Sequence, residues 1–151
     1  MKKGAIAISA MLIGGMIYLI WRPESLLMFS WAEKLSLLHV VEALREFGRE
    51  CLPNPPAWVL NSLPHALWIF SGIVLLGTVW GETSLRWFML WSFSLITISI
   101  FSELGQISGL LPGTYDFSDI AGMLIASIAG YAITIGSIIN QDEGNNENEC
   151  Y

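Results

Sequence analysis

The stretch that decides the fold is E-L-G-Q-I-S-G-L-L-P-G-T-Y-D-F-S-D-I-A-G, residues 103–122, which lies between two long apolar runs. Its centre, L-P-G-T, predicts a tight turn, because proline presets one backbone φ and glycine permits an unusual one. The turn should bring the end of one helix, which carries Glu103 and Gln106, close to the start of the next. That second helix carries Asp116 and Asp119 at its head. Carboxylates are costly in or beside a bilayer, so these residues form a candidate functional site.

Composition indicates that the whole chain belongs in a membrane. The 151 residues are 54% hydrophobic and only 13% charged, and the mean hydropathy is +0.57. Soluble domains carry about 25% charged residues. Seven Trp and seven Phe suit aromatic belts at the two membrane interfaces. We therefore expect an integral membrane protein that forms one compact unit.

The charge and the cysteines argue against several functional classes. The formal net charge of −6 and the lack of a basic stripe disfavour nucleic-acid binding, so we expect no nucleic-acid partner. Cys51 and Cys150 are the two cysteines. They fall on opposite sides of the bilayer in the predicted topology, so we expect no disulfide between them. No CxxC or Cys/His cluster occurs, and we expect neither a metal nor a cofactor.

Four apolar runs are long enough to cross a bilayer, at about 1.5 Å per residue against a hydrocarbon core of about 30 Å. The predicted spans are residues 4–21, 63–81, 86–106 and 117–139. The first resembles a signal peptide, but no small-x-small cleavage site follows it, so we interpret it as an uncleaved membrane helix. Pro64 should lie near the start of the second span, where a helix tolerates proline.

Two segments outside the spans are predicted to be an interfacial helix and a disordered tail. Residues 31–47 carry apolar side chains at helical spacing and charges of both signs elsewhere, which favours an amphipathic helix along the membrane surface. The predicted fold is therefore all-α, a four-helix membrane bundle at residues 1–140 with an interfacial helix between spans one and two. Residues 141–151, Q-D-E-G-N-N-E-N-E-C-Y, have almost nothing to bury and should form a disordered acidic tail.

Four spans place both termini on one side of the membrane and the conspicuous polar helix ends on the other. That second side receives Arg22 after span one, His65 at the opening of span two, and the acidic stretch between spans three and four. Positive charges are nearly balanced between the two sides, but Lys2 and Lys3 precede the first helix, which usually dominates orientation. We expect a multi-pass protein of the cell membrane with cytoplasmic termini and an outward-facing polar cluster.

The residues of the acidic stretch have helical spacing. Glu103 and Gln106 are three residues apart and share a face of one helix, and the two Asp residues repeat this spacing on the next. If the pairs face each other, three carboxylates meet one amide, and at least one carboxyl pKa should rise. A shared proton, a bound cation or a nearby Arg22 or His65 would relieve the repulsion. Such a site could bind a cationic or hydroxyl-rich headgroup or perform acid–base chemistry.

Each of these residues also has a purely structural interpretation. Asp116 could cap the last helix, Asp119 could complement the dipole of that helix, and Glu103 could reach headgroup water. His65 lies beside a proline near a predicted helix entrance, where a structural role is common. The four acidic-stretch residues taken together favour a site over four independent structural roles.

The same stretch resembles a known family. The pattern E-x-x-Q, a short Pro-Gly loop, and D-x-x-D-[IL]-x-G at the head of the last membrane helix is similar to the motif of VanZ-like membrane proteins. The likeness covers residues 103–122 and extends weakly to residues 62–68, S-L-P-H-A-L-W. Many VanZ-like chains place an Arg between the two acidic pairs. This chain has P-G-T-Y there, so no role of that Arg is carried over.

The resemblance and the residues together lead to a first hypothesis, a non-enzymatic protein of the cell envelope. The family is named for a protein linked to teicoplanin resistance, which implies a role in glycopeptide or envelope-stress resistance. The protein would bind a membrane lipid, a lipid-linked cell-wall precursor or a partner membrane protein through its outward-facing cluster. The binding residues in this hypothesis are Glu103, Gln106, Asp116, Asp119, His65 and Arg22.

The alternative hypothesis is an intramembrane enzyme that acts on a lipid-linked substrate. Glu103 would act with Asp116 or Asp119 as acid and base, and the catalytic candidates are Glu103 and Asp119. The sequence contains no nucleophile motif, Gly-rich phosphate loop or HExxH, which favours the binding hypothesis. Ion translocation is disfavoured as well, because the middles of spans two to four carry Ser and Thr but no ionisable side chain.

Overall fold

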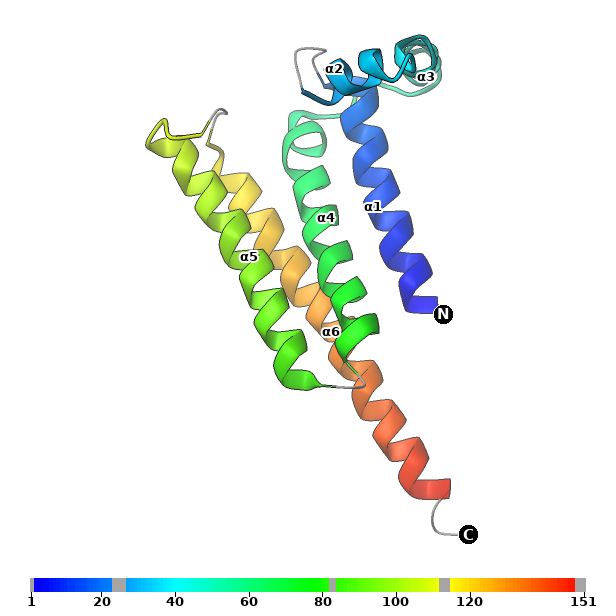
Figure 1. Cartoon of the computed structure of the whole chain (residues 1–151), viewed down its shortest axis with the longest axis vertical. Helices are drawn as coiled ribbons and strands as arrows, with labels where there is room; N and C mark the ends of the chain where they lie inside the picture. Colours follow the sequence, from blue (N-terminus) through cyan, green and yellow to red (C-terminus); the bar gives the residue numbers. More distant parts are fainter. Residues whose placement is uncertain (1, 23–26, 82–83, 112–114, 149–151) are drawn as a thin grey trace.

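The computed structural model of this protein is helical throughout the residues that it describes. It describes the backbone of residues 2–22, 27–81, 84–111 and 115–148, and the side chains of residues 2–22, 29–81, 84–111 and 115–136. These residues form six helices and no strand, which confirms the predicted all-α fold (Figure 1). The helices are α1 (Lys2–Trp21), α2 (Leu27–Lys34), α3 (Leu38–Cys51), α4 (Ala57–Trp80), α5 (Leu85–Ile107) and α6 (Phe117–Asn148).

Four of these helices, α1, α4, α5 and the Phe117–Gly136 part of α6, are long and apolar enough to cross a membrane. Consecutive long helices run in opposite directions. The start of α1 and the end of α6 therefore lie at one end of the bundle, as do the end of α4 and the start of α5 (Figure 1). The other end, here called the α3 end, carries α2, α3 and the described part of the α5–α6 connection (Figure 1).

Helix α4 is the centre of the bundle. It packs most extensively against α6 and α1, and less extensively against α5. Ile69, Ile73, Phe88 and Met123 form a buried cluster between α4, α5 and α6. Gly77 brings α4 close to α6, because a Cβ atom built there would lie 2.3 Å from Cγ2 of Thr134. Membrane helices associate through such close packing of small residues, since lipid tails are as apolar as the helices.

The interfacial segment forms two helices, so the prediction of one helix over residues 31–47 is wrong. Helix α2 ends in a Schellman motif: the Leu37 N–H donates to the Ala32 carbonyl at 2.8 Å, and the Ser36 N–H to the Glu33 carbonyl at 2.9 Å. Ser36 takes the left-handed conformation that this motif requires, with φ of 57°. The apolar spacing continues across the break, which explains why periodicity did not reveal it.

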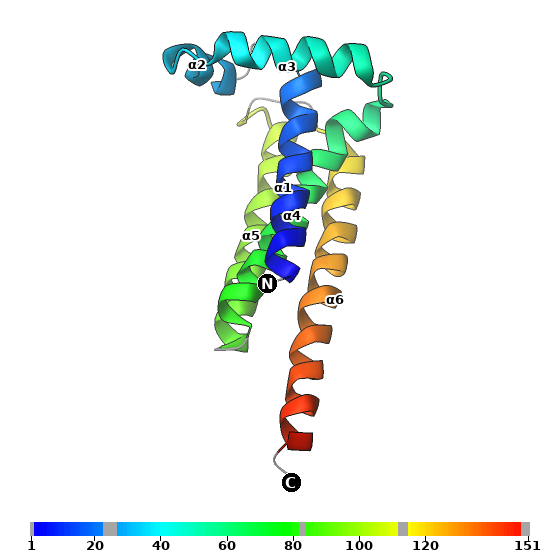
Figure 2. The same cartoon turned by 90° about the vertical axis from the view of Figure 1, so that its right-hand side faces the viewer.

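Helices α2 and α3 lie across the end of α1 (Figure 2). Arg45 of α3 is 5% exposed, and its Nη1 donates to the carbonyl oxygens of Leu19 at 2.7 Å and Arg22 at 2.9 Å. These carbonyls belong to the end of α1, where the helix dipole favours a positive charge. The guanidinium also lies 4.9 Å from the ring centroid of Phe29. Arg45 therefore fastens the interfacial segment to the first membrane helix.

Two helix boundaries differ from the predicted ones. Helix α4 begins at Ala57, so Pro64 lies inside the helix and not near its start. Membrane helices tolerate an interior proline because neighbouring groups satisfy the freed backbone. Helix α6 continues to Asn148, into the segment expected to be a disordered tail, since extending an existing helix requires no new nucleus.

Of the two cysteines, Cys51 is free and exposed, and Cys150 lies outside the described residues. The Pro-Gly centre of the predicted turn also lies outside the described residues.

Candidate functional site

The candidate site is a cavity of about 330 Å³ between α4 and α5, toward the α3 end of the bundle. This volume is within the range of about 300–1,000 Å³ that is usual for small-molecule sites. Three of the predicted residues, His65, Glu103 and Gln106, line the cavity together with Ser99 and Ser102. The four α5 residues, at positions 99, 102, 103 and 106, follow the spacing i, i+3, i+4, i+7 and so share one face of that helix. The structure thus brings part of the predicted cluster into one cavity.

Glu103 is the most unusual side chain of this cavity. It is only 3% exposed, and its Oε2 atom is buried without a hydrogen-bond partner among the described residues. The side chain of Gln106 lies close enough to the Glu103 carboxyl group to hydrogen-bond with it, and His65 and Asp119 act on it electrostatically. Leaving a buried carboxyl oxygen unpaired is costly. Glu103 therefore has an unsatisfied carboxyl oxygen in a side chain that lines the cavity.

His65 brings the basic group of the site from α4. Its Nδ1 atom lies 3.1 Å from the carbonyl oxygen of Asn61. A carbonyl can only accept, so Nδ1 carries the proton and Nε2 is the acceptor in the neutral ring. The ring stands edge-on to Trp68, with centroids 6.0 Å apart, and to Tyr18 of α1, with centroids 6.4 Å apart. Aromatic packing thus fixes the orientation of His65.

Arg22 lies one aromatic ring away from the cavity and is not among the residues that line it. Its guanidinium is stacked 4.9 Å from the ring centroid of Tyr18, the same ring that contacts His65. The basic side chain that acts on Glu103 is therefore His65 and not Arg22. Among the described residues, Arg22 is connected to the site through the Tyr18 ring, and its backbone carbonyl accepts a hydrogen bond from Arg45.

Asp119 lies in the contact between α4 and α6 and is 6% exposed. It accepts a hydrogen bond from the Ser62 hydroxyl at 2.5 Å. The Ser62 and Ser118 hydroxyl oxygens are 3.0 Å apart. The Ser118 hydroxyl has one hydrogen, which it can donate either to Ser62 or to the neighbouring carboxyl group of Asp116. Because Asp119 also acts electrostatically on Glu103, it connects this hydroxyl pair to the cavity.

Asp116 has the capping geometry that its position suggests. Its Oδ1 atom accepts a hydrogen bond from the Ser118 backbone N–H at 2.9 Å, ahead of the first turn of α6. The Ser118 hydroxyl and N–H hold the pKa of this exposed carboxyl below its ordinary value of 3.8. The cap therefore contributes stability at neutral pH and loses it only as the pH falls through that lowered pKa. Asp116 does not line the cavity, although its charge acts on Glu103.

Sequence reasoning missed Ser62, Ser99, Ser102 and Trp68 as parts of the site. Helical spacing gave a signal for all four, because Ser62 and Trp68 are each three residues from His65, and Ser99 and Ser102 precede Glu103 and Gln106 by four. Serine is common in membrane helices, however, and spacing alone does not separate a site residue from a packing residue. Only the approach of α6 distinguishes Ser62, through its bond to Asp119.

The side chains of the site offer mainly hydrogen-bond acceptors, which suits a ligand that donates hydrogen bonds. A buried carboxyl oxygen and the His65 Nε2 atom can accept, and Gln106 can both donate and accept. Within the described residues, no group of three or more His, Cys, Asp or Glu side chains is arranged to hold a metal ion.

Comparison of the chain with family models, with curated proteins and with solved structures yields no match in any of the three. The resemblance to VanZ-like proteins therefore rests on the motif residues alone.

Proposed function

We propose that this protein is a small VanZ-like membrane protein of the cell envelope, which binds a membrane lipid or a lipid-linked cell-wall precursor through the cavity at the α3 end. One observation supports this proposal above all others. The Oε2 atom of Glu103 is a buried acceptor without a partner among the described residues, and it belongs to a side chain that lines the cavity. A hydroxyl or amine of a ligand would satisfy it.

The chemistry of the surrounding groups narrows the ligand further. Asp119 and Asp116 are both acidic and lie close enough to Glu103 to act on it electrostatically. Like charges repel in a medium of low dielectric constant, so an anionic group beside Glu103 is disfavoured, and a neutral or cationic donor is favoured. The cavity lies between the N-terminal half of α4 and the C-terminal half of α5, toward the α3 end of the bundle. These features favour a polar headgroup rich in hydroxyl or amine groups.

The role in the cell that we propose follows from the orientation expected from the sequence. With cytoplasmic termini, the α3 end faces outward, where cell-wall precursors are exposed to glycopeptide antibiotics. A protein that holds such a precursor, or the lipid around it, would change the response of the envelope to these antibiotics. A partner membrane protein could dock through the same end.

Glu103→Gln is the substitution that tests the binding proposal. It keeps the shape of the side chain but removes the charge, so the lipid that co-purifies with the protein in mild detergent should fall about tenfold or more, because a hydrogen bond to a charged group is worth about 1.5–3 kcal/mol. The measurement is mass spectrometry of extracted lipid, normalised to protein. Glu46→Gln, at an exposed position of α3, is the matched control and should retain the wild-type amount. Equal retention by both variants would contradict the proposal.

The alternative that we retain is an intramembrane enzyme for a lipid-linked substrate. It is favoured by the proximity of Glu103 to His65 and Asp119, which supplies both an acid and a base. The same variant separates the two functions. A catalytic Glu103 predicts that Glu103→Gln abolishes conversion of the lipid while the variant still binds it. A binding role predicts that retention itself is lost.

A further inference from the structure

We infer that an apolar groove between α4 and α6 holds one hydrocarbon chain of an amine-bearing membrane lipid. The inference deepens the proposed function and rests on it in one respect: the lipid whose headgroup occupies the cavity is taken to be the lipid whose chain occupies the groove. The groove and the cavity are separate surfaces, and the groove is tested by its own residues.

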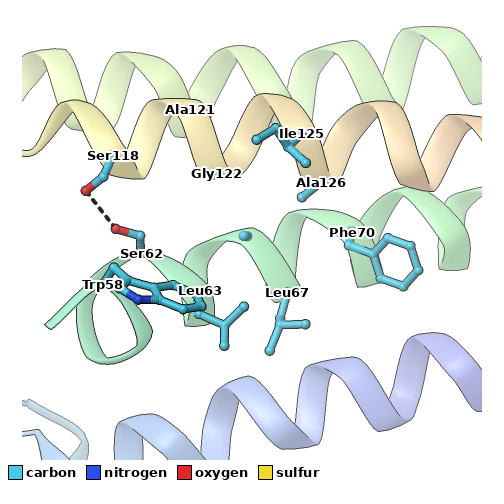
Figure 3. A pocket seen from close by; sticks show the side chains of 11 residues that line it. Trp58, Ser62, Leu63, Leu67, Phe70, Ser118, Ala121, Gly122, Ile125 and Ala126 are labelled. Carbon is cyan, nitrogen blue, oxygen red and sulfur yellow. Dashed lines mark hydrogen bonds between the residues drawn. The ribbon is translucent and has the colours of Figure 1, made fainter. Parts of the chain in front are cut away.

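The groove has a volume of about 530 Å³ and an almost wholly apolar lining. Leu63, Leu67 and Phe70 line it from α4, and Ala121 and Ile125 line it from α6 (Figure 3). Among the described residues of the lining, the hydroxyl groups are those of Ser62 and Ser118, which are joined by a hydrogen bond and lie toward the α3 end (Figure 3). The lining therefore suits an alkyl chain with a polar group at the α3 end.

The length of the groove selects a lipid chain over a partner helix. Its α4 lining runs from Trp58 to Phe70, which corresponds to about 18 Å at 1.5 Å per residue. One leaflet contributes about half of a hydrocarbon core of about 30 Å. The groove is thus as long as one leaflet is deep, which fits a single lipid chain. A partner membrane helix would need an apolar seam along the whole bundle.

The charges at the α3 end select the headgroup. Asp116 is exposed beside Ser118, and its lowered pKa keeps it ionised at neutral pH. Asp119 is hydrogen-bonded to Ser62 of the groove and acts electrostatically on Glu103 of the cavity. The carboxyl groups of Asp116 and Asp119 flank Ser118 of the groove at the head of α6, where they attract an ammonium group and repel an anionic one. Phosphatidylethanolamine fits this arrangement better than phosphatidylglycerol with the same chains.

The test is native mass spectrometry of the full chain with phosphatidylethanolamine or phosphatidylglycerol added in detergent. We expect the wild-type protein to retain one phosphatidylethanolamine and much less phosphatidylglycerol. Ala121→Phe fills the groove, so the bound fraction should fall about tenfold, a change typical of overpacking by a large side chain. Ala129→Phe, on an exposed face of α6, is the matched control and should behave as the wild type. Unchanged retention in Ala121→Phe, or equal retention of the two lipids, would overturn the inference.

A second measurement uses the wild-type protein and so does not depend on the folding of a variant. Phosphatidylethanolamine with a photoreactive group near the end of one chain should label peptides around Phe70 and Ile125, and excess unlabelled lipid should suppress the label. Labelling spread over exposed α5 positions such as Phe93 and Ile98, without suppression, would overturn the inference.

The groove and the cavity can also be separated by their variants. Lipid loss in Ala121→Phe with normal retention in Glu103→Gln would support the groove and contradict the proposed role of the cavity. Loss in Glu103→Gln with normal retention in Ala121→Phe would contradict the groove and leave the proposed function intact.

Discussion

Replacing Gly77 with alanine should lower the free energy of unfolding by about 1–3 kcal/mol, the usual cost of overpacking a close contact. The added Cβ atom would lie 2.3 Å from Cγ2, 2.8 Å from Oγ1 and 3.1 Å from Cβ of Thr134. Thr134 is 1% exposed and has little room to move. The contact belongs to the most extensive helix pair of the bundle, α4 with α6. The two helices would have to separate, and the bundle would lose packing along its centre.

Thermal unfolding in detergent measures this effect, and two further variants give it a control. Gly136→Ala introduces the same methyl group on α6 where no atom lies within 4 Å, so its melting temperature should be close to that of the wild type. Thr134→Ala removes two of the three clashing atoms and should recover part of the loss when it is combined with Gly77→Ala. The coupling between the two substitutions is the quantity of interest, because Thr134→Ala has a cost of its own. Equal melting temperatures for the two glycine variants would contradict the described packing.

Ser62→Ala should destabilise the protein by about 1–3 kcal/mol, because it leaves a buried carboxyl group without its donor. The acceptor that loses its partner is Asp119, which receives the Ser62 hydroxyl at 2.5 Å. Adding Asp119→Leu to Ser62→Ala should restore stability, since an apolar pair leaves no unsatisfied group. Asp119→Leu alone should impair membrane insertion little, because leucine inserts more easily than aspartate. All three variants should lose the bound lipid, because each one removes a polar group between the groove and the cavity.

The measurements are the melting temperature and the lipid retained by each variant. Ser94→Ala is the control, since the Ser94 hydroxyl donates only within its own helix, to the Leu90 carbonyl at 2.8 Å. If the double variant loses as much stability as the two single variants together, the Ser62–Asp119 hydrogen bond does not account for the stability lost in Ser62→Ala. Normal lipid retention by Asp119→Leu would reduce Asp119 to a structural residue.

The membrane spans could be predicted from the sequence because a run of apolar residues of sufficient length has few other stable folds. Successive spans run in opposite directions, so successive connections lie at opposite ends of the bundle. The number of spans therefore predicted which polar helix ends lie together at the α3 end. The spacing of Glu103 and Gln106 predicted that they share a face, and both line one cavity. These predictions depend only on local periodicity and on chain direction.

Two of the features that the sequence did not predict depend on contacts between segments far apart in the chain. Arg45 is charged, yet it lies with Gly48 on the buried face of α3, where it donates to the carbonyls at the end of α1. Ser62 becomes a site residue only because α6 brings Asp119 beside it. The break at Ser36 differs from these two cases, because its hydrogen bonds are local. The sequence did not predict it because serine adopts the left-handed backbone conformation less readily than glycine. For Arg45 and Ser62 the deciding partner lies outside the local pattern.

The most direct test of the account is the sidedness of three single-cysteine variants toward a membrane-impermeant maleimide on intact cells. Cys51 lies exposed at the end of α3 and is labelled alone in Cys150→Ser. Leu110→Cys marks the α5–α6 connection, and Arg86→Cys marks the opposite end of the bundle; both are made without the native cysteines, at positions that are exposed. The account predicts that positions 51 and 110 react from outside, and that position 86 reacts only after permeabilisation. Labelling of positions 51 and 110 from opposite sides would contradict the shared end on which the site depends.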